Sequence, residues 1–295
     1  MLGRGSLTGA LLAAAMLAPA VSPDDVIGSP TTYVTREEDT LLDIARLSDL
    51  GYVEIRAANP TVDPWLPGRG RHLTLPTQHV LPDAPRRGIV INLPELRLYY
   101  FPAKGAPRSF PIGIGGEGRE TPVGRTEISS KRIHPQWIPT KSEHDEDSEL
   151  PAVVPPGPDN PMGDYALSLG WKGYAVHGTN KPYSIGRRDS HGCIRMYPED
   201  IETLFRLVVV GTPVTVVNQP AKAGWLGDVL YLEVHPEQSD ADWLESQGAP
   251  RSPGTVDAET AVLKAAGHWA DQLDWYTMAL AEERRTGRAV PVLRR

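Results

Sequence analysis

The chain has 295 residues, 40% of them hydrophobic, and a formal net charge of −7. At about 150 residues per domain this length accommodates two domains, and the negative charge excludes the broad basic surface of nucleic-acid-binding proteins. The single cysteine excludes an internal disulfide and any zinc site built from several cysteines. The 28 glycines and 29 prolines indicate a turn-rich, mostly β protein.

Residues 1–20 have the pattern of an export signal. Arg4 precedes an apolar run from Leu7 to Leu17, and Ala18-Pro19-Ala20 fits the small residues of a cleavage site. The run is shorter than the roughly 20 residues of a membrane span, although an uncleaved anchor is the alternative interpretation. We expect cleavage after Ala20, export from the cytoplasm, and no transmembrane span after cleavage.

Residues 31–79 form a first unit with the order strand, helix, helix, strand. The strands are expected at Thr32–Val34 and His72–Leu75, and the helices from Asp39 or Thr40 and over Tyr52–Asn59. This βααβ order, with Asn59-Pro60 and Pro67-Gly68, resembles a LysM module. The resemblance implies binding of glycans such as peptidoglycan; the alternative is a small structural domain. Residues 78–87, with two prolines, are expected to be a linker.

Residues 88–218 contain many short strands between turn signals, which predicts a β-sandwich-like or barrel domain. The fold class is therefore mostly β (α+β). One helix is expected over Pro198–Val208, with Pro198 in its first turn. The expected strands are 88–93, 95–101, 109–114, 125–129, 166–169, 174–177 and 212–217.

Two further segments stand apart from these strands. Residues 131–163 are irregular and carry an acidic cluster followed by prolines, which favours a loop or lid. Residues 219–295 form a C-terminal extension with a strand at 229–234. An apolar stripe of period three to four predicts one amphipathic helix near 255–285, a helical tail that packs on the rest of the protein.

The lone cysteine lies in Ser190-His191-Gly192-Cys193-Ile194-Arg195, and a second His-Gly pair, His177-Gly178, lies upstream. A thiol with an ordinary pKa is mostly protonated at neutral pH, so a nucleophilic cysteine needs a nearby base. Either histidine is a candidate for that base. Gly192 permits a turn whose backbone N–H groups converge on an oxyanion.

Two other interpretations of these residues remain open at this point. The cysteine is inert and buried, or His177, His191, Cys193 and Asp189 bind a metal as in a metallopeptidase. Sensitivity to chelators separates the metal site from a thiol enzyme.

His177-Gly178-Thr179 followed by Ser190-His191-Gly192-Cys193-Ile194-Arg195-Met196 resembles the signature of the L,D-transpeptidase catalytic domain (YkuD-type). Thr121-Pro122-x-Gly124, Pro135-x-Trp137 and the segment 156–163 support the match. With the export signal and the LysM-like unit, the arrangement resembles the larger periplasmic members of this family.

The resemblance implies a role for each motif residue. Cys193 is the nucleophile and His177 the base, with the imidazole held by the carbonyl of Gly178. His191, Gly192 and Cys193 line the oxyanion site. Ser190 and Arg195 shape the substrate pocket, and Arg195 binds a substrate carboxylate. The resemblance implies no cofactor, no metal, and acylation of the thiol by carbapenems.

The implied donor is a peptidoglycan tetrapeptide stem, attacked at the meso-diaminopimelate carbonyl with release of D-Ala. The acceptor stays open. An amine of another stem gives a 3-3 crosslink, an outer-membrane protein gives covalent anchoring, and water gives an L,D-carboxypeptidase or hydrolase. A cell-wall-binding protein with an inactive catalytic domain is the alternative from a different class.

Overall fold

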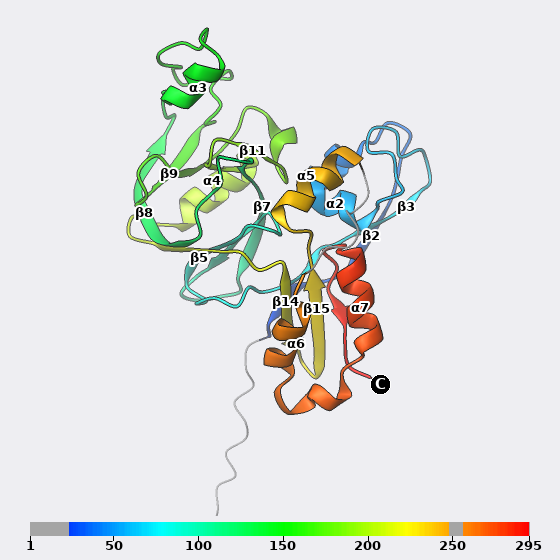
Figure 1. Ribbon diagram of the computed structural model, residues 1–295. Helices are drawn as coiled ribbons and strands as arrows, with labels where there is room; N and C mark the ends of the chain where they lie inside the picture. The colour runs from blue at the N-terminus through cyan, green and yellow to red at the C-terminus, as the bar shows by residue number, and fades with distance from the viewer. Residues whose placement is uncertain (1–23, 248–255, 295) are drawn as a thin grey trace, which may run out of the picture.

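The computed structural model describes residues 24–247 and 256–294 of the chain; the expected signal peptide, residues 1–20, lies outside them. Three parts surround a central β domain: an N-terminal βααβ unit, a projecting lobe, and a C-terminal sheet with helices (Figure 1). The mostly β fold class is confirmed. Within the described residues, none of the helices combines the length and apolar character that crossing a bilayer requires.

The central domain is one mixed sheet that closes on itself. Its order is β11-β7-β12-β10-β9-β8-β13-β5-β6, and β6 also pairs with β7. This closure gives the sandwich-like domain a barrel form and leaves β11 beside β7 outside the ring. The strands are β5 (Gly88–Asn92), β6 (Arg97–Phe101), β7 (Arg108–Gly115), β8 (Gly124–Ile133), β9 (Tyr165–Leu169), β10 (Ala175–His177), β11 (Arg188–Ser190), β12 (Ile194–Met196) and β13 (Pro213–Val217).

The barrel core explains why these segments are strands. Apolar side chains at alternate positions, such as Ile89 and Ile91 of β5, point inward and are fully buried. Helix α4 (Pro198–Leu207) covers one side through Ile201 and Leu204, and its proline occupies the first turn as expected. A short 3-10 turn, η1 (Pro182–Ser184), precedes β11.

The N-terminal unit has the expected element order. It consists of β2 (Thr31–Val34), α1 (Leu41–Leu47), α2 (Tyr52–Ala58) and β3 (His72–Leu75), with β2 antiparallel to β3. Thr40 is the N-cap of α1 because its hydroxyl accepts the N–H of Asp43. The unit has its own small apolar core, which includes Leu41, Ile44 and Leu73.

The segment 78–87 is not simply a linker. It begins with β4 (Gln78–Val80), a buried strand that pairs with β1 (Val26–Gly28). The backbone polar groups of a buried segment need partners, and pairing with β1 supplies them. The remainder, residues 81–87, lacks helix and strand, as expected of a connection.

The N-terminal unit is fixed against the barrel rather than tethered to it. The N–H groups of Tyr52 and Val53 donate to the carbonyls of Ile185 and Gly186. Gly186 has a φ of +78°, and a Cβ there would lie 2.1 Å from the Tyr52 nitrogen. Only glycine permits both the backbone conformation and this close approach.

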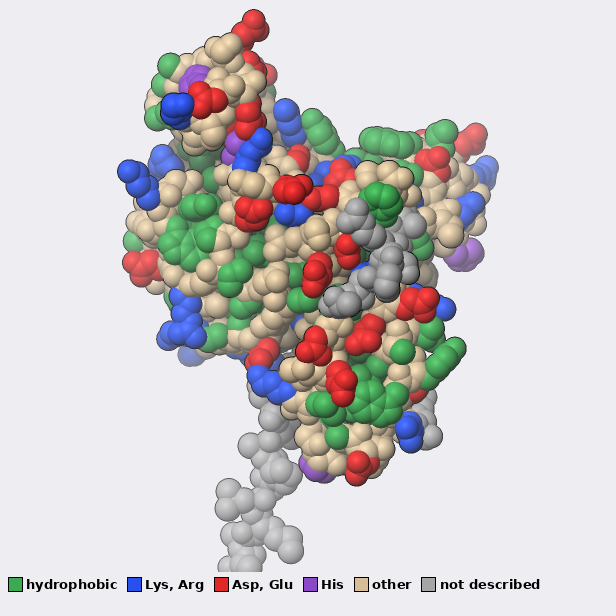
Figure 2. Space-filling model, viewed as in Figure 1, with side chains coloured by type: hydrophobic (Ala, Val, Ile, Leu, Met, Phe, Trp, Pro, Cys, Tyr) green, Lys and Arg blue, Asp and Glu red, His purple; other side chains and the backbone are tan. Residues whose placement is uncertain are grey.

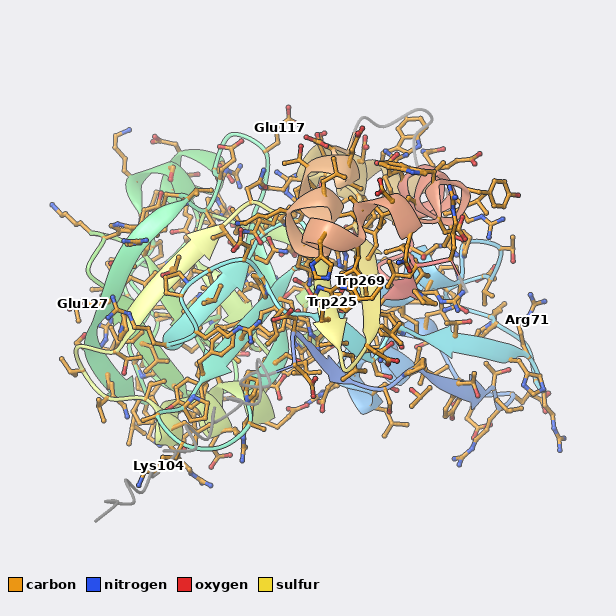
Figure 3. All side chains as sticks on the ribbon, turned by 90° about the horizontal axis from the view of Figure 1, so that it is seen from below. Arg71, Lys104, Glu117, Glu127, Trp225 and Trp269 are labelled. Atoms are coloured by element: carbon orange, nitrogen blue, oxygen red, sulfur yellow. The ribbon has the colours of Figure 1, made fainter. Side chains whose placement is uncertain are left out.

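The C-terminal extension is a sheet with helices rather than a helical tail. Its strands are β14 (Ala221–Leu226), β15 (Val229–Val234) and β16 (Val290–Pro291), and its helices include α5 (Gln238–Gln247). Trp225 of β14 and Trp269 line one pocket in this part, and their labels lie close together in Figure 3.

The structure divides the helix expected near 255–285 into three pieces. These are α6 (Ala258–Ala266), η2 (Gly267–Gln272) and α7 (Trp275–Arg284). Gly267 adopts a φ of +54° and ends α6, and Asp274 caps a new helix by accepting the N–H of Thr277. The apolar period continues across this break because α6 and α7 both pack on β15 and Ala270 of η2 contacts the same apolar cluster, so the period alone does not indicate the break.

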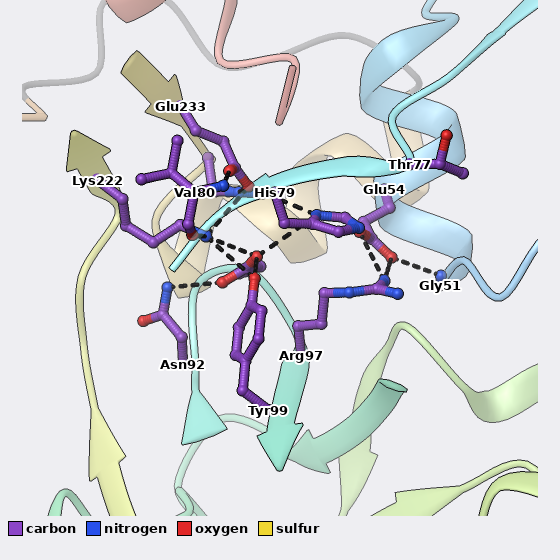
Figure 4. A network of polar contacts seen from close by, with 12 residues as sticks. Gly51, Glu54, Thr77, His79, Val80, Asn92, Arg97, Tyr99, Lys222 and Glu233 are labelled. Atoms are coloured by element: carbon purple, nitrogen blue, oxygen red, sulfur yellow. Dashed lines mark hydrogen bonds and ion pairs between the residues drawn. The ribbon is translucent and has the colours of Figure 1, made fainter. Parts of the chain in front are cut away.

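A buried polar network joins the N-terminal unit and the C-terminal sheet to the barrel (Figure 4). Arg97 of β6 forms an ion pair with Glu54 of α2 at 2.8 Å, with both side chains almost wholly buried. Lys222 of β14 contacts Glu95 of the barrel at 2.7 Å and Glu233 of β15 at 3.2 Å. Unpaired buried charges are costly, so each part needs the others to neutralise its charges.

Within the described residues, His79, Glu95 and Glu233 bring potential metal-ligand atoms within 4.8 Å of one another. The Lys222 ammonium already contacts both carboxylates, and burial holds the pKa of His79 below its usual value. A cation of the chain itself, the Lys222 ammonium, therefore already occupies the position between the two carboxylates.

The buried network predicts unequal effects of two charge removals. Glu54→Gln leaves Arg97 buried without a charged partner, and we expect a loss of about 3–5 kcal/mol in the free energy of unfolding. Arg46→Gln removes the half-exposed ion pair with Glu199 and should cost less than about 1 kcal/mol. Urea unfolding of both variants measures the difference. Equal losses would contradict an essential role for the buried pair.

Candidate active site

Strands β10 and β12 place the motif residues together. They pair in parallel, with His177 opposite Arg195. Cys193 directly precedes β12 and lies two residues before Arg195, so its side chain faces the same side as those of His177 and Arg195. The two halves of the motif, far apart in the chain, thus meet on one face of the sheet.

His177 is buried at the end of β10 and held in one orientation. Its Nδ1 lies 2.6 Å from the carbonyl oxygen of Gly178. Because a carbonyl only accepts, Nδ1 carries the proton and Nε2 of the neutral ring is free to accept one. Burial, and after it the positive charge of Arg195, lowers the pKa of His177 to about 4. The imidazole is therefore a neutral base at pH 7.

The Cys193 thiol is protonated in this arrangement. Burial, opposed in part by Arg195 and reinforced by the negative charge of Glu143, raises the pKa of the thiol above its usual value. The S–H donates to the carbonyl of Gly173 at 3.6 Å. The thiol and the imidazole therefore both rest in their neutral forms.

Hydrogen bonds within the turn fix the position of Cys193. The Ser190 hydroxyl donates to the carbonyl of Cys193 at 2.6 Å and accepts the N–H of Gly192 at 3.2 Å. Thr121 donates to the carbonyl of Gly192 at 2.8 Å and accepts the N–H of Gly115 at 3.1 Å. The turn is therefore attached to β7 and to the loop before β8.

Gly192 adopts a φ of +99°, and a Cβ there would lie 2.9 Å from the ring of Tyr174. A side chain at this position would both strain the backbone and collide with the ring. This explains why the residue between His191 and Cys193 is glycine.

The guanidinium of Arg195 is only partly available to a substrate group. Its Nη1 donates to Asp189 at 2.9 Å, and the arginine side chain is 18% exposed. Its charge favours the thiolate of Cys193 and disfavours protonation of His177. Asp189 thus pairs with Arg195 next to the thiol.

The His191 ring makes contacts other than with Cys193. Its Nε2 lies 2.9 Å from Arg119 Nη1 and 3.1 Å from Glu146 Oε2, and Nδ1 lies 3.5 Å from Glu143. Contact with a guanidinium is unfavourable for metal binding by the same ring nitrogen. The four-ligand metal site considered from the sequence therefore has no support in this geometry.

The segment 131–163 forms the projecting lobe. Strand β8 extends to Ile133, and the lobe then contains α3 (Lys141–Glu146) and a bridge between Trp137 and Val154. Buried Asn160 joins the two ends of the lobe where it leaves the barrel, since the Asn160 side-chain nitrogen donates to the carbonyl of Pro135 at 2.8 Å. Acidic side chains are prominent on the lobe (Figure 2). The expected loop is present, with more internal structure than its composition suggests.

Two site features escaped the sequence analysis. Thr121 lies within a segment that matches the family, but no local pattern predicts its hydrogen bond to the turn of Cys193. Arg119 was not considered, because its partners His191 and Glu146 are distant in sequence. The acidic cluster of residues 143–149 was the available signal, yet composition does not say which cation it contacts.

Residues 86–216 match the YkuD family model, the L,D-transpeptidase catalytic domain. The chain is 40% identical to the probable L,D-transpeptidase ErfK/SrfK of Salmonella typhimurium over 276 residues, which cover 90% of this chain and 87% of that protein. The chain belongs to the L,D-transpeptidase family. The matched region contains His177, Gly178 and the whole of the Ser190–Arg195 motif.

Two other L,D-transpeptidases illustrate the range of similarity. The probable L,D-transpeptidase YcfS of Escherichia coli is 45% identical over 207 residues, covering 67% of this chain and 65% of YcfS, slightly less than two thirds of its length. The solved catalytic domain of the Enterococcus faecium L,D-transpeptidase is 24% identical and covers 46% of this chain and 100% of that domain, with a TM-score of 0.37.

The burial of His177 predicts an unusual titration. NMR of the imidazole protons should give a pKa of about 4. Because the folded pKa is below the unfolded one, the unfolded state binds more protons between pH 4 and 6.5. Stability should therefore be lost as pH falls through that window, by about 3 kcal/mol in total. Titration of His177 near pH 6.5 would contradict the lowering of its pKa by burial.

Proposed function

We propose that this L,D-transpeptidase acts in the periplasm on peptidoglycan stems, with Cys193 as nucleophile and His177 as base. The observation that carries the proposal is the pairing of β10 with β12, which brings a neutral imidazole and a protonated thiol to one face. Membership of the family supports the same reaction. The donor is a tetrapeptide stem with meso-diaminopimelate followed by D-Ala.

In the first half-reaction, Cys193 Sγ attacks the carbonyl at the L centre of diaminopimelate while its proton moves to His177 Nε2. A C–S bond forms, and the carbonyl oxygen becomes an oxyanion. Collapse of this intermediate breaks the amide C–N bond. The proton on His177 passes to the amine of departing D-Ala, and a thioester remains on Cys193.

In the second half-reaction, an acceptor amine attacks the thioester. His177 Nε2 takes a proton from the amine, a C–N bond forms and the C–S bond breaks. The proton then returns to the sulfur. The acceptor is an amine of another stem, which gives a 3-3 crosslink, or a lysine of an outer-membrane protein; water as acceptor gives a carboxypeptidase.

The remaining motif residues support this reaction. The Gly192 N–H is engaged by Ser190 at 3.2 Å, so we assign the backbone N–H of Cys193 as the main oxyanion donor. Ser190 holds the turn, Gly178 orients the base, and Arg195 tunes the charge around both reacting side chains. His191 lines the entrance with its ring.

The N-terminal unit is proposed to bind glycan strands. Its βααβ order supports the LysM resemblance, and Trp65 and Leu66 in its α2–β3 loop are exposed at 61% and 77%. Exposed apolar side chains of this kind are typical of binding surfaces. Because the unit is fixed to the barrel, a bound strand would be held in a constant orientation to Cys193.

Incubation of the mature protein with a disaccharide-tetrapeptide tests the proposal by mass spectrometry. We expect a Cys193-dependent product that has lost D-Ala, either a crosslinked dimer or a tripeptide. Cys193→Ala should abolish turnover, and His177→Ala should lower it by at least about a hundredfold because proton transfer is lost.

Arg46→Gln, remote from the thiol and half-exposed, is the matched control and should retain full activity. Turnover by the Cys193→Ala variant would refute the nucleophile assignment. A complete absence of turnover by the wild-type protein, with or without an amine acceptor, would refute the proposed substrate.

A further inference from the structure

Glu146 of the lobe contacts two side chains beside Cys193 that can donate hydrogen bonds to a carboxylate, Arg119 and His191. Glu146 at the end of α3 contacts Arg119 Nη2 at 2.5 Å through one oxygen and His191 Nε2 at 3.1 Å through the other. Glu143, one turn earlier, lies 3.5 Å from the other nitrogen of His191. One carboxylate therefore spans a guanidinium and an imidazole.

Arg119 is attached to the nucleophile turn. Its backbone carbonyl lies 3.4 Å from the position that a Cβ of Gly192 would take, and Thr121, two residues later, bonds the Gly192 carbonyl. His191 is two residues before Cys193. His191 thus belongs to the turn that holds the thiol and Arg119 lies against that turn, while the negative charge of Glu143 contributes to the raised pKa of the thiol.

The contact between α3 and this pair is easily exchanged. Helix α3 buries none of its six residues, so no apolar core holds it in place. Arg119 and Glu146 are 40% and 45% exposed, and ion pairs of such exposure contribute at most about 1 kcal/mol. A carboxylate presented by a bound ligand can replace that of Glu146 at little cost.

Arg119 is also better placed for a ligand than Arg195. The Arg195 guanidinium is 18% exposed and already donates to Asp189, which lies beside it in the same motif. A planar guanidinium suits a carboxylate through charge-assisted hydrogen bonds, and His191 donates to the second carboxylate oxygen when its ring carries a hydrogen on Nε2.

We propose that Arg119 and His191 form a binding subsite for a carboxylate of the donor stem, and that Glu146 of α3 occupies this subsite in the absence of donor. This inference rests on the proposed function. The stem offers two such groups near the reacting carbonyl: the terminal carboxylate of D-Ala and the second carboxylate of diaminopimelate. Entry of either group displaces Glu146 and moves α3 away from Cys193.

Steady-state kinetics on the full chain test the subsite. With the natural tetrapeptide, Arg119→Gln should raise KM about tenfold with little change in kcat, since the lost interaction is made on binding. Glu146→Gln should lower KM severalfold, because the competing charge is gone. Asp145→Asn is the matched control on α3, since Asp145 pairs with Lys141 at 2.7 Å, and it should leave KM unchanged.

Two amidated donors identify the carboxylate. One carries D-alaninamide at its terminus, and the other carries diaminopimelate amidated at its second carboxylate. With the donor that lacks the recognised group, wild type and Arg119→Gln should have the same KM. An Arg119→Gln effect that is equal for all three donors, or equal effects of Glu146→Gln and Asp145→Asn, would overturn the subsite.

Calorimetric measurement of tetrapeptide binding to the Cys193→Ala variant separates this inference from the proposed reaction. If wild type turns over the stem and Arg119→Gln changes nothing, the subsite is wrong and the reaction stands. If no turnover occurs but Cys193→Ala binds the stem about tenfold more tightly than the Cys193→Ala/Arg119→Gln double variant, the subsite stands and the reaction is wrong. Absence of both turnover and binding refutes both.

Discussion

The parallel pairing of β10 with β12 is the constraint on which the site depends. Its register places His177 opposite Arg195 and brings Cys193 to the same face. A shift of one residue would turn Cys193 to the opposite face of the sheet. The register is specified on both strands, because Val176, which precedes His177, and Ile194, which lies between Cys193 and Arg195, are paired and fully buried in the barrel core.

Electrostatics around this pair follow from burial. The same dry environment that lowers the pKa of His177 raises that of Cys193, so both side chains rest in their neutral forms. Neutral partners avoid the cost of a buried thiolate before substrate is present. The Gly178 carbonyl orients the imidazole without adding a full negative charge, as a carboxylate would. The positive charge of Arg195 opposes part of the rise in the pKa of Cys193.

The N-terminal unit and the C-terminal sheet contact the barrel through buried charges and not through apolar side chains alone. Glu54 from the N-terminal unit and Lys222 from the C-terminal sheet each neutralise a charge of the barrel. The N-terminal unit, the barrel and the C-terminal sheet therefore form one structure, in which the proposed glycan-binding unit and the thiol keep a fixed relation. The lobe differs, since α3 has no buried residue and contacts the site through exposed ion pairs.

Local patterns made part of this arrangement predictable. The motif around Cys193, the helix from Pro198 and the βααβ order depend on neighbouring residues, and the sequence alone indicates them. Closure of the barrel by β6 and β7, the strand at 78–80 and the break at Gly267 depend on partners distant in the chain. The contact of His191 with Arg119 and Glu146 belongs to the same class, which is why the sequence indicates His191 as a candidate base, metal ligand or oxyanion-site residue but not as a partner of these two side chains.

The most direct test of the account is intact-protein mass spectrometry of the enzyme during reaction with a tetrapeptide donor, followed by proteolytic mapping. We predict a transient adduct with the mass of the stem without D-Ala, attached to Cys193 as a thioester and released by hydroxylamine. Product formation without such an adduct, or an adduct on another residue, would contradict covalent catalysis by Cys193.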